Sequence, residues 1–272
     1  VDLEECIHRL ENGTSLVDFV PGRKDISDRF QIPQKLYGRS AETAALLGAF
    51  SRVGGRAGQV VLVSGYSGVG KSALVNEMHK PVVRQRGYFI AGKFDQYKRN
   101  IPYTALVQAF GELVRQLLSE SPDKVAIWKE CLLNALGVRA SILAAVIPTI
   151  ERLIGPQPPA APLPPATTQA QFNRALSSVA GVFADQQRPL VLFLDDLQWA
   201  DGASRQLIRD LSSDAAGRYF MLIGAYRSQD LTPSHPMTLV LDEMRQAGAS
   251  VTAISLEALD YSHVNQLVAD TL

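Results

Sequence analysis

The sequence predicts an α/β fold built on a five-stranded, mainly parallel sheet that is flanked by helices. Three observations predict it. Compact apolar runs alternate along the chain with helical patterns, the runs are continuously apolar as in strands buried on both faces, and a glycine-rich turn joins the first run to a helix. The 272 residues can hold one large domain, or one domain with an appendage.

The glycine-rich turn is GYSGVGKS at residues 65–72, which matches the phosphate-binding pattern G-x-x-x-x-G-K-[ST]. It follows the apolar run 59–63 and precedes a helical segment at 72–78, which is the context that the pattern requires. We expect Lys71 to bridge the β- and γ-phosphates and Ser72 to bind Mg²⁺. The nucleotide-binding residues predicted in this loop are Gly65, Tyr66, Ser67, Gly68, Val69, Gly70, Lys71, Ser72 and Ala73.

The type of nucleotide follows from two further patterns. Residues 68–73 also fit the weak dinucleotide fingerprint G-x-G-x-x-A, but a Lys-Ser pair inside it favours a nucleoside triphosphate over NAD. The guanine-specific pattern Asn-Lys-x-Asp does not follow in the sequence, so ATP is favoured over GTP.

The N-terminal half predicts these elements in order. Residues 1–34 form a short helix and a linker arm, and residues 35–272 form the main domain. A helix at 41–53 precedes the strand and the phosphate loop. Pro81 cannot donate a helical hydrogen bond, so we expect the next helix to break or kink near Lys80. The second strand follows at 87–94.

The stretch 103–183 predicts an all-helical insertion between the second and third strands. Apolar residues at three- and four-residue spacing indicate a helix at 103–119, and Ser121-Pro122 begins another. A third helical piece runs from 138 to 153, and a proline-rich surface loop occupies 155–166. Thr168, with Gln171, is expected to cap a helix that ends at Phe183.

The C-terminal part predicts three more strands, at 190–194, 219–225 and 251–255, and a helix at 202–211 that Asp201 caps. The chain stops inside a helical pattern. We therefore expect it to be an excerpt from a longer polypeptide.

Charged side chains follow the third and fourth strands. Asp195 is expected to hold Mg²⁺ opposite Ser72, and Asp196 to orient the attacking water or accept its proton. Because side chains alternate along a strand, we expect the two carboxylates to point apart. Arg227 is placed to neutralise charge on the γ-phosphate. The alternatives are a solvated turn residue for Asp196, and for Arg227 a surface arginine that pairs with Asp230.

Several motifs together resemble STAND-type ATPases, a signal-transduction branch of the AAA+-related P-loop ATPases. They are LDDLQWAD at 194–201, GAYR at 224–227 and YGRSAE at 37–42. The run GKFDQYKRNIPY at 92–103 further resembles the predicted ATPase module of large bacterial multi-domain sensor kinases. The resemblance covers roughly residues 30–272.

The resemblance implies more about the protein. The module would lie between a Ser/Thr kinase domain and GAF and histidine-kinase domains, which become its expected partners, along with nucleotide-dependent self-association. Tyr37 and Gly38 become candidate contacts of the adenine base, the alternative being that Tyr37 is only a packed aromatic. A helical lid should follow where this chain ends, so we expect slow hydrolysis by the fragment.

Composition bounds the remaining possibilities. The chain has 27 basic and 27 acidic residues, so it lacks the basic excess typical of nucleic-acid binding. The two cysteines lie far apart, which favours a reduced, cytoplasmic compartment. No apolar run reaches the ~20 residues that span a bilayer. The histidines show no zinc-binding spacing.

The sequence thus predicts an Mg²⁺-dependent, ATP-binding and slowly hydrolysing switch module of a signalling protein. Three alternatives stay open: a DNA-binding AAA+ protein of the origin-recognition type, a small-molecule kinase, and an ATP-binding scaffold without turnover. The sequence assigns no firm role to Lys98 and Arg99, which fit a solvated loop, or to Trp199, which fits a packing anchor.

Overall fold

The computed structural model describes residues 35–55, 58–212 and 219–271. Contacts divide the chain into a larger unit, Gly38–Leu259, and a smaller one whose described residues are 35–37 and 260–271. The smaller unit contains helix α12 (Tyr261–Thr271). The helix and arm predicted for residues 1–34 lie outside the described residues, so that prediction is not tested.

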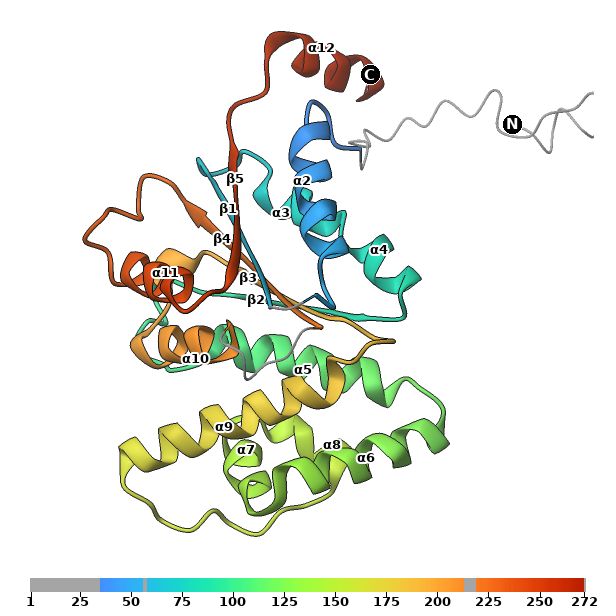
Figure 1. The fold of residues 1–272 in the computed structure, drawn as a ribbon, viewed down its shortest axis with the longest axis vertical. Coiled ribbons are helices and arrows are strands. Elements are labelled where there is room, and N and C mark those ends of the chain that lie inside the picture. Colours follow the sequence, from blue (N-terminus) through green and yellow to red (C-terminus); the bar gives the residue numbers. More distant parts are fainter. Residues whose placement is uncertain (1–34, 56–57, 213–218, 272) are drawn as a thin grey trace, which may run out of the picture. The chain divides into compact units, whose positions relative to one another are not determined.

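The larger unit is built on a five-stranded sheet in which every pair of neighbouring strands is parallel, in the order β2-β3-β4-β1-β5 (Figure 1). This confirms the predicted fold class. The strands are β1 (Gln59–Gly65), β2 (Tyr88–Lys93), β3 (Leu190–Asp195), β4 (Phe220–Arg227) and β5 (Ser250–Leu256). The three inner strands are almost wholly buried, whereas the edge strand β5 is only partly buried.

Helices cover both faces of the sheet (Figure 1). One face carries α2 (Ser40–Ser51), α3 (Lys71–Asn76) and α4 (His79–Arg84), and the other carries α5 (Thr104–Leu118), α10 (Gly202–Ser212) and α11 (Pro236–Gln246). Coverage on both faces explains why the inner strands are apolar at successive positions.

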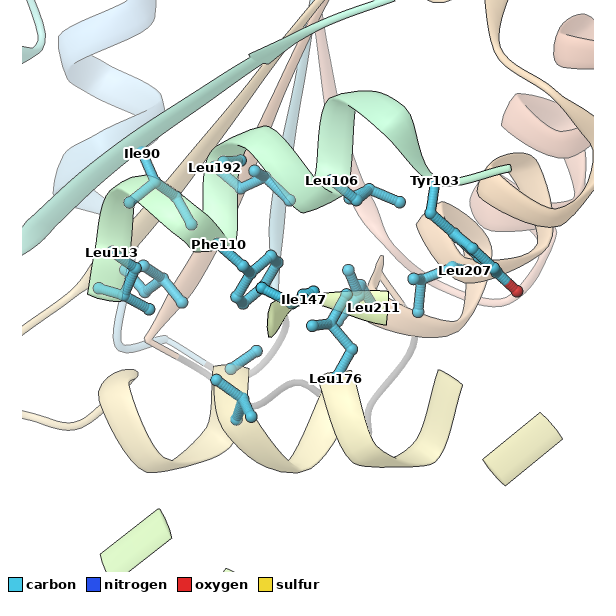
Figure 2. Close-up of a cluster of buried hydrophobic side chains, with 14 of the residues drawn as sticks. Ile90, Tyr103, Leu106, Phe110, Leu113, Ile147, Leu176, Leu192, Leu207 and Leu211 are labelled. Atoms are coloured by element: carbon cyan, nitrogen blue, oxygen red, sulfur yellow. The ribbon is translucent and has the colours of Figure 1, made fainter. Parts of the chain in front are cut away.

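The predicted helical insertion forms a further layer beyond α5 (Figure 1). It contains α6 (Pro122–Leu136), α7 (Ala140–Val146), α8 (Glu151–Ile154) and α9 (Pro165–Phe183). Figure 2 shows Phe110 of α5 between the sheet residues Ile90 and Leu192 on one side and Leu176 of α9 on the other. The buried side chains of sheet and insertion belong to one continuous cluster, so the insertion is part of the same core.

Prolines account for two differences from the predicted helices. Helix α9 begins at Pro165, the first helical position, and Thr168 donates to the carbonyls of Leu163 and Pro164 instead of capping the helix, so that prediction was wrong. The segment 138–153 is interrupted because Pro148 keeps the preceding residue, Ile147, out of the helical region.

The helix after the phosphate loop ends earlier than predicted. Helix α3 stops at Asn76, and α4 starts at His79 and continues through Pro81. Pro81 lies in the first turn of α4, where a backbone N–H has no partner within the helix. The proline is therefore compatible with α4 and does not break it. Helix α11 was not among the predicted elements. No helix in the described part of the chain is both long and apolar enough to cross a membrane.

Helix α5 approaches β2 most closely at Gly92. A Cβ atom built on Gly92 would lie 1.9 Å from the carbonyl oxygen of Ala105, the second residue of the helix. We expect Gly92→Ala to lower the free energy of unfolding by about 1–3 kcal/mol, because backbone atoms must shift to admit the methyl group. Urea unfolding followed by circular dichroism measures this.

Gly181→Ala is the matched control, since Gly181 lies in α9 with open space around the position of its Cβ atom. This change should stabilise the chain by up to about 1 kcal/mol through helix propensity. Equal effects of the two substitutions would contradict the close approach of α5 to β2.

Candidate functional site

The carboxyl ends of four strands meet at one edge of the sheet. Strand β4 lies between β1 and β3, and its Arg227 is in register with Gly65 at the end of β1. In the pair formed by β2 and β3, Lys93 of β2 is in register with Asp195 of β3. These ends surround a cavity of about 230 Å³. Its lining residues are Ser67, Gly68, Gly70, Lys71, Ser72, Ala73, Lys93, Asp195, Asp196 and Arg227.

All of these lining residues except Lys93 were predicted from the sequence. The loop residues Gly65, Tyr66 and Val69 do not line the cavity. Gly70 adopts a left-handed conformation, with φ of 99°, immediately before α3 begins. Glycine has no Cβ atom and takes up this conformation at little cost, so the loop can turn directly into the helix.

Lys71 is 7% exposed, and its ammonium lies within the loop. Its Nζ atom donates to the carbonyl oxygens of Gly65, at 3.0 Å, and Tyr66, at 2.7 Å. Burial lowers the pKa of Lys71, and the nearby carboxylates of Asp195 and Asp196 oppose that shift. An ammonium has three donors, so Lys71 can hold both carbonyls and still donate to an anion in the cavity.

Ser72 and Asp195 come together from α3 and β3. The hydroxyl of Ser72 donates to Oδ2 of Asp195 at 3.0 Å. Hydroxyl and carboxylate oxygens are ligands that Mg²⁺ accepts, so this pair fits the predicted metal position. The described residues hold no cluster of three or more His, Cys, Asp or Glu side chains arranged for a metal ion. A magnesium ion here would therefore depend on phosphate oxygens and water for its other ligands.

Asp196 lies just beyond the end of β3 in a left-handed conformation, with φ of 55° and ψ of 46°. Lys93 Nζ is 3.2 Å from Oδ2 of Asp196 and 3.8 Å from Oδ2 of Asp195. The expectation that the carboxylates point apart was therefore wrong, because the chain leaves the strand between them. The hydrogen bond to Asp196, with the charge of Asp195, raises the pKa of Lys93.

The side chain of Gln198 connects the ends of β3 and β4. It is 3% exposed and belongs to the 3₁₀ turn Leu197–Trp199. Its Nε2 donates to Oδ1 of Asp196 at 2.9 Å, and its Oε1 accepts from the backbone N–H of Arg227 at 3.2 Å. The guanidinium of Arg227 itself lies 3.7 Å from Oδ1 of Asp196. Asp196 is therefore a buried, partnered carboxylate and not a solvated turn residue.

Arg39, from the YGRSAE motif, supports the back of the phosphate loop. It is 7% exposed, donates to the carbonyl oxygens of Val69, at 3.3 Å, and Glu257, and pairs with Glu42. Tyr37 belongs to the smaller unit, where its hydroxyl donates to Asp270 at 2.7 Å. Contacts of Tyr37 and Gly38 with an adenine base stay a prediction.

Sequence reasoning missed Lys93, Gln198 and Arg39. Gln198 and Arg39 lie inside motifs quoted above, and Lys93 ends a strand on the ligand side, so the position of each residue could have drawn attention to it. Their interaction partners could not be identified from the sequence, since Lys93 and Asp196, for example, are far apart in it.

A second cavity, of about 1150 Å³, adjoins the first and shares Lys93, Asp196 and Arg227 with it. The connection between β2 and α5 supplies nearly half of its lining residues. At its rim the guanidinium of Arg99 stacks on the ring of Trp199 at 3.9 Å. Trp199 therefore anchors this connection to the turn that follows Asp196.

A family model described as an AAA ATPase domain matches residues 35–223. The chain belongs to this family. It is 38% identical over 194 residues to hybrid signal transduction histidine kinase G of Dictyostelium discoideum, covering 71% of this chain and 6% of that protein. It is 23% identical over 173 residues to histidine protein kinase 1 of Candida albicans, covering 58% and 7%. The chain thus spans less than a tenth of the length of these relatives.

Among solved structures, the chain is similar to Cdc6p from Pyrobaculum aerophilum, with a TM-score of 0.50 and 12% identity over 89% of this chain and 51% of that one. Such a likeness shows the fold. The AAA ATPase family and the fold together confirm the resemblance to AAA+-related P-loop ATPases, and they support nucleotide binding and ATPase activity in general.

His235 ties the start of α11 to this site. Its Nδ1 accepts from the backbone N–H of Met237 at 3.1 Å, and its ring lies close to the backbone of Gln198. Burial, with the charges of Arg205 and Arg99, lowers the pKa of His235. The ring must be neutral at Nδ1 to cap the helix.

We expect His235→Ala to lower the free energy of unfolding by about 1 kcal/mol near pH 7.5, the usual effect of losing a helix cap. The pKa of His235 is lower in the folded state than its unfolded value of about 6.5. Its contribution is therefore complete above about pH 6.5 and is lost as the pH falls through the folded value. Urea unfolding from about pH 5 to pH 8 measures this dependence.

His235→Asn is the matched variant, because asparagine caps helices and does not titrate in this range. It should retain stability near pH 7.5 and lose less of it on acidification than the unsubstituted chain. Identical pH dependences of these two proteins would contradict the capping role.

Proposed function

We propose that this chain is an ATP-binding and slowly hydrolysing, Mg²⁺-dependent module that acts as a nucleotide-controlled switch in a multi-domain signalling protein. The observation that carries the proposal is that Lys71, Ser72, Asp195, Asp196 and Arg227 line one cavity. They are contributed by α3, β3, β4 and the turn after β3, and they combine phosphate-binding, metal-binding and water-orienting chemistry in one place.

In this proposal Lys71 donates to the β- and γ-phosphates of ATP, and Ser72 and Asp195 hold Mg²⁺. The ion would neutralise charge on the phosphate oxygens when bound. Arg227, one of the cavity residues, stabilises the charge that develops on the γ-phosphate. Catalysis would come from positioning and electrostatics, as in other phosphoryl transfers.

Asp196 is proposed to orient the attacking water and accept its proton. Its carboxylate already contacts Lys93, Gln198 and Arg227. A carboxylate has about four lone-pair sites, so these contacts leave capacity for a water molecule. They also fix the direction in which that water would be held.

The adenine base of ATP is proposed to lie near Tyr37 and Gly38, as the STAND resemblance implies. Within the larger unit, Arg39 follows Gly38 and donates to the carbonyl oxygen of Val69 in the phosphate loop.

The signalling role rests on the relatives, two of which are named as histidine kinases. We propose that the partners of this module are kinase and sensor domains of the same polypeptide, and that nucleotide state controls self-association. The likeness to Cdc6p is one of fold, and the chain has no basic excess for DNA. Salt-sensitive DNA binding by this chain would favour the origin-recognition alternative.

We expect Lys71→Ala to weaken ATP binding by about 100-fold or more, because charge-assisted hydrogen bonds to the phosphates are lost. Isothermal titration calorimetry with ATP and Mg²⁺ measures the affinity. Lys80→Ala removes an exposed lysine of the neighbouring helix and should leave it unchanged. Unaltered binding by the Lys71 variant would remove the loop from the proposal.

We expect Asp196→Asn to bind ATP within about threefold of the unsubstituted chain and to hydrolyse it about 100-fold more slowly, because the water is no longer oriented by a carboxylate. Phosphate release measures turnover. Asp242→Asn, an exposed carboxylate of α11, serves as the control. Turnover that survives in the Asp196 variant would exclude it from the mechanism, and ATP binding without turnover in the unsubstituted chain would favour a scaffold.

A further inference from the structure

Gln198 occupies an unusual position among the polar residues of the site. It lines neither of the two cavities, and it is 97% buried. Its side chain nevertheless bonds Asp196 and Arg227, each of which lines both cavities. Its amide nitrogen donates to Asp196, and its amide oxygen accepts from the backbone of Arg227. Because the two ends of an amide differ, this pair of bonds allows one orientation of the side chain.

Asp196 needs such a support. Its left-handed backbone is a conformation that a non-glycine residue adopts at a cost, and it persists only where surrounding contacts hold it. The strand geometry of β3 therefore does not fix where the carboxylate points. Gln198 bonds Oδ1, the same oxygen that faces the Arg227 guanidinium, while Lys93 bonds Oδ2. The two oxygens thereby acquire different neighbours.

The turn that carries Gln198 is itself held on two sides. Leu197 packs so closely on β4 that a Cβ atom on Gly224 would lie 2.3 Å from its Cδ1 atom. On the other side, the ring of His235 lies close to the backbone of Gln198. Gln198 is therefore held in place by its surroundings while its side chain bonds both Asp196 and Arg227.

We propose that Gln198 is a positioning residue that holds Asp196 and Arg227 in one arrangement. The group that orients water and the group that stabilises charge on the γ-phosphate then move together. This inference rests on the proposed function, because it assigns Gln198 to the same ATP site. It follows that loss of the amide reduces both turnover and the preference for ATP over ADP, while the binding of ADP is retained.

Two substitutions in the 272-residue chain separate the two hydrogen bonds. Gln198→Met has similar length and loses both bonds. It should lower turnover at least tenfold and reduce the ratio of affinities for a non-hydrolysable ATP analogue and ADP by about fivefold to tenfold, with the affinity for ADP within about twofold. Gln198→Glu keeps the acceptor for Arg227 and loses the donor to Asp196. It should lower turnover by a similar factor and retain more of the affinity ratio.

Turnover is expressed per ADP-binding site, so that partial unfolding of a variant does not imitate the effect. Gln187→Met, at an exposed position before β3, is the control and should change neither quantity. Normal turnover and a normal affinity ratio in both Gln198 variants, with an active unsubstituted chain, would overturn this inference alone. Equal losses of ADP and ATP affinity would overturn it as well, because they indicate a general structural role. An unsubstituted chain that binds neither nucleotide would overturn the proposed function and this inference with it.

Discussion

The charge balance around Asp195 and Asp196 is the interaction on which the rest of the site depends. Two adjacent carboxylates that are largely removed from water require positive partners, since an unpaired buried charge is costly. Lys93 pairs with both of them, Arg227 with Asp196, and Lys71 lies within their electrostatic reach. These cations come from β2, β4 and α3, so two strands must end, and one helix must begin, where β3 ends.

The sheet meets this requirement through its strand order. With β4 between β1 and β3, Arg227 stands between the phosphate loop and the acidic pair. The parallel registers then bring Gly65, Arg227, Asp195 and Lys93 to the same edge. Helix α5 and the insertion stabilise the sheet on one face, because their side chains pack with those of the sheet in one core (Figure 2).

The turn after β3 connects the site to the remainder of the domain. Its Leu197 packs on β4, its Gln198 bonds Asp196 and Arg227, and its Trp199 stacks with Arg99 of the β2–α5 connection. His235 extends the contacts to the start of α11. The turn therefore joins Asp196 to the β2–α5 connection and to the start of α11 through a continuous series of contacts.

The sequence by itself determined the five parallel strands, the phosphate loop and the charged residues at strand ends, because local spacing and apolar runs encode them. The helix ends near Pro81, Pro148 and Thr168 differ from the predicted ones, because the effect of a proline depends on whether it lies in the first turn of a helix or further inside. Only the tertiary structure decided the strand order, the left-handed Asp196 and the roles of Lys93 and Gln198. Their partners are groups on other elements, as with Lys93 at the end of β2 and Asp196 after β3. No local pattern records such a pairing.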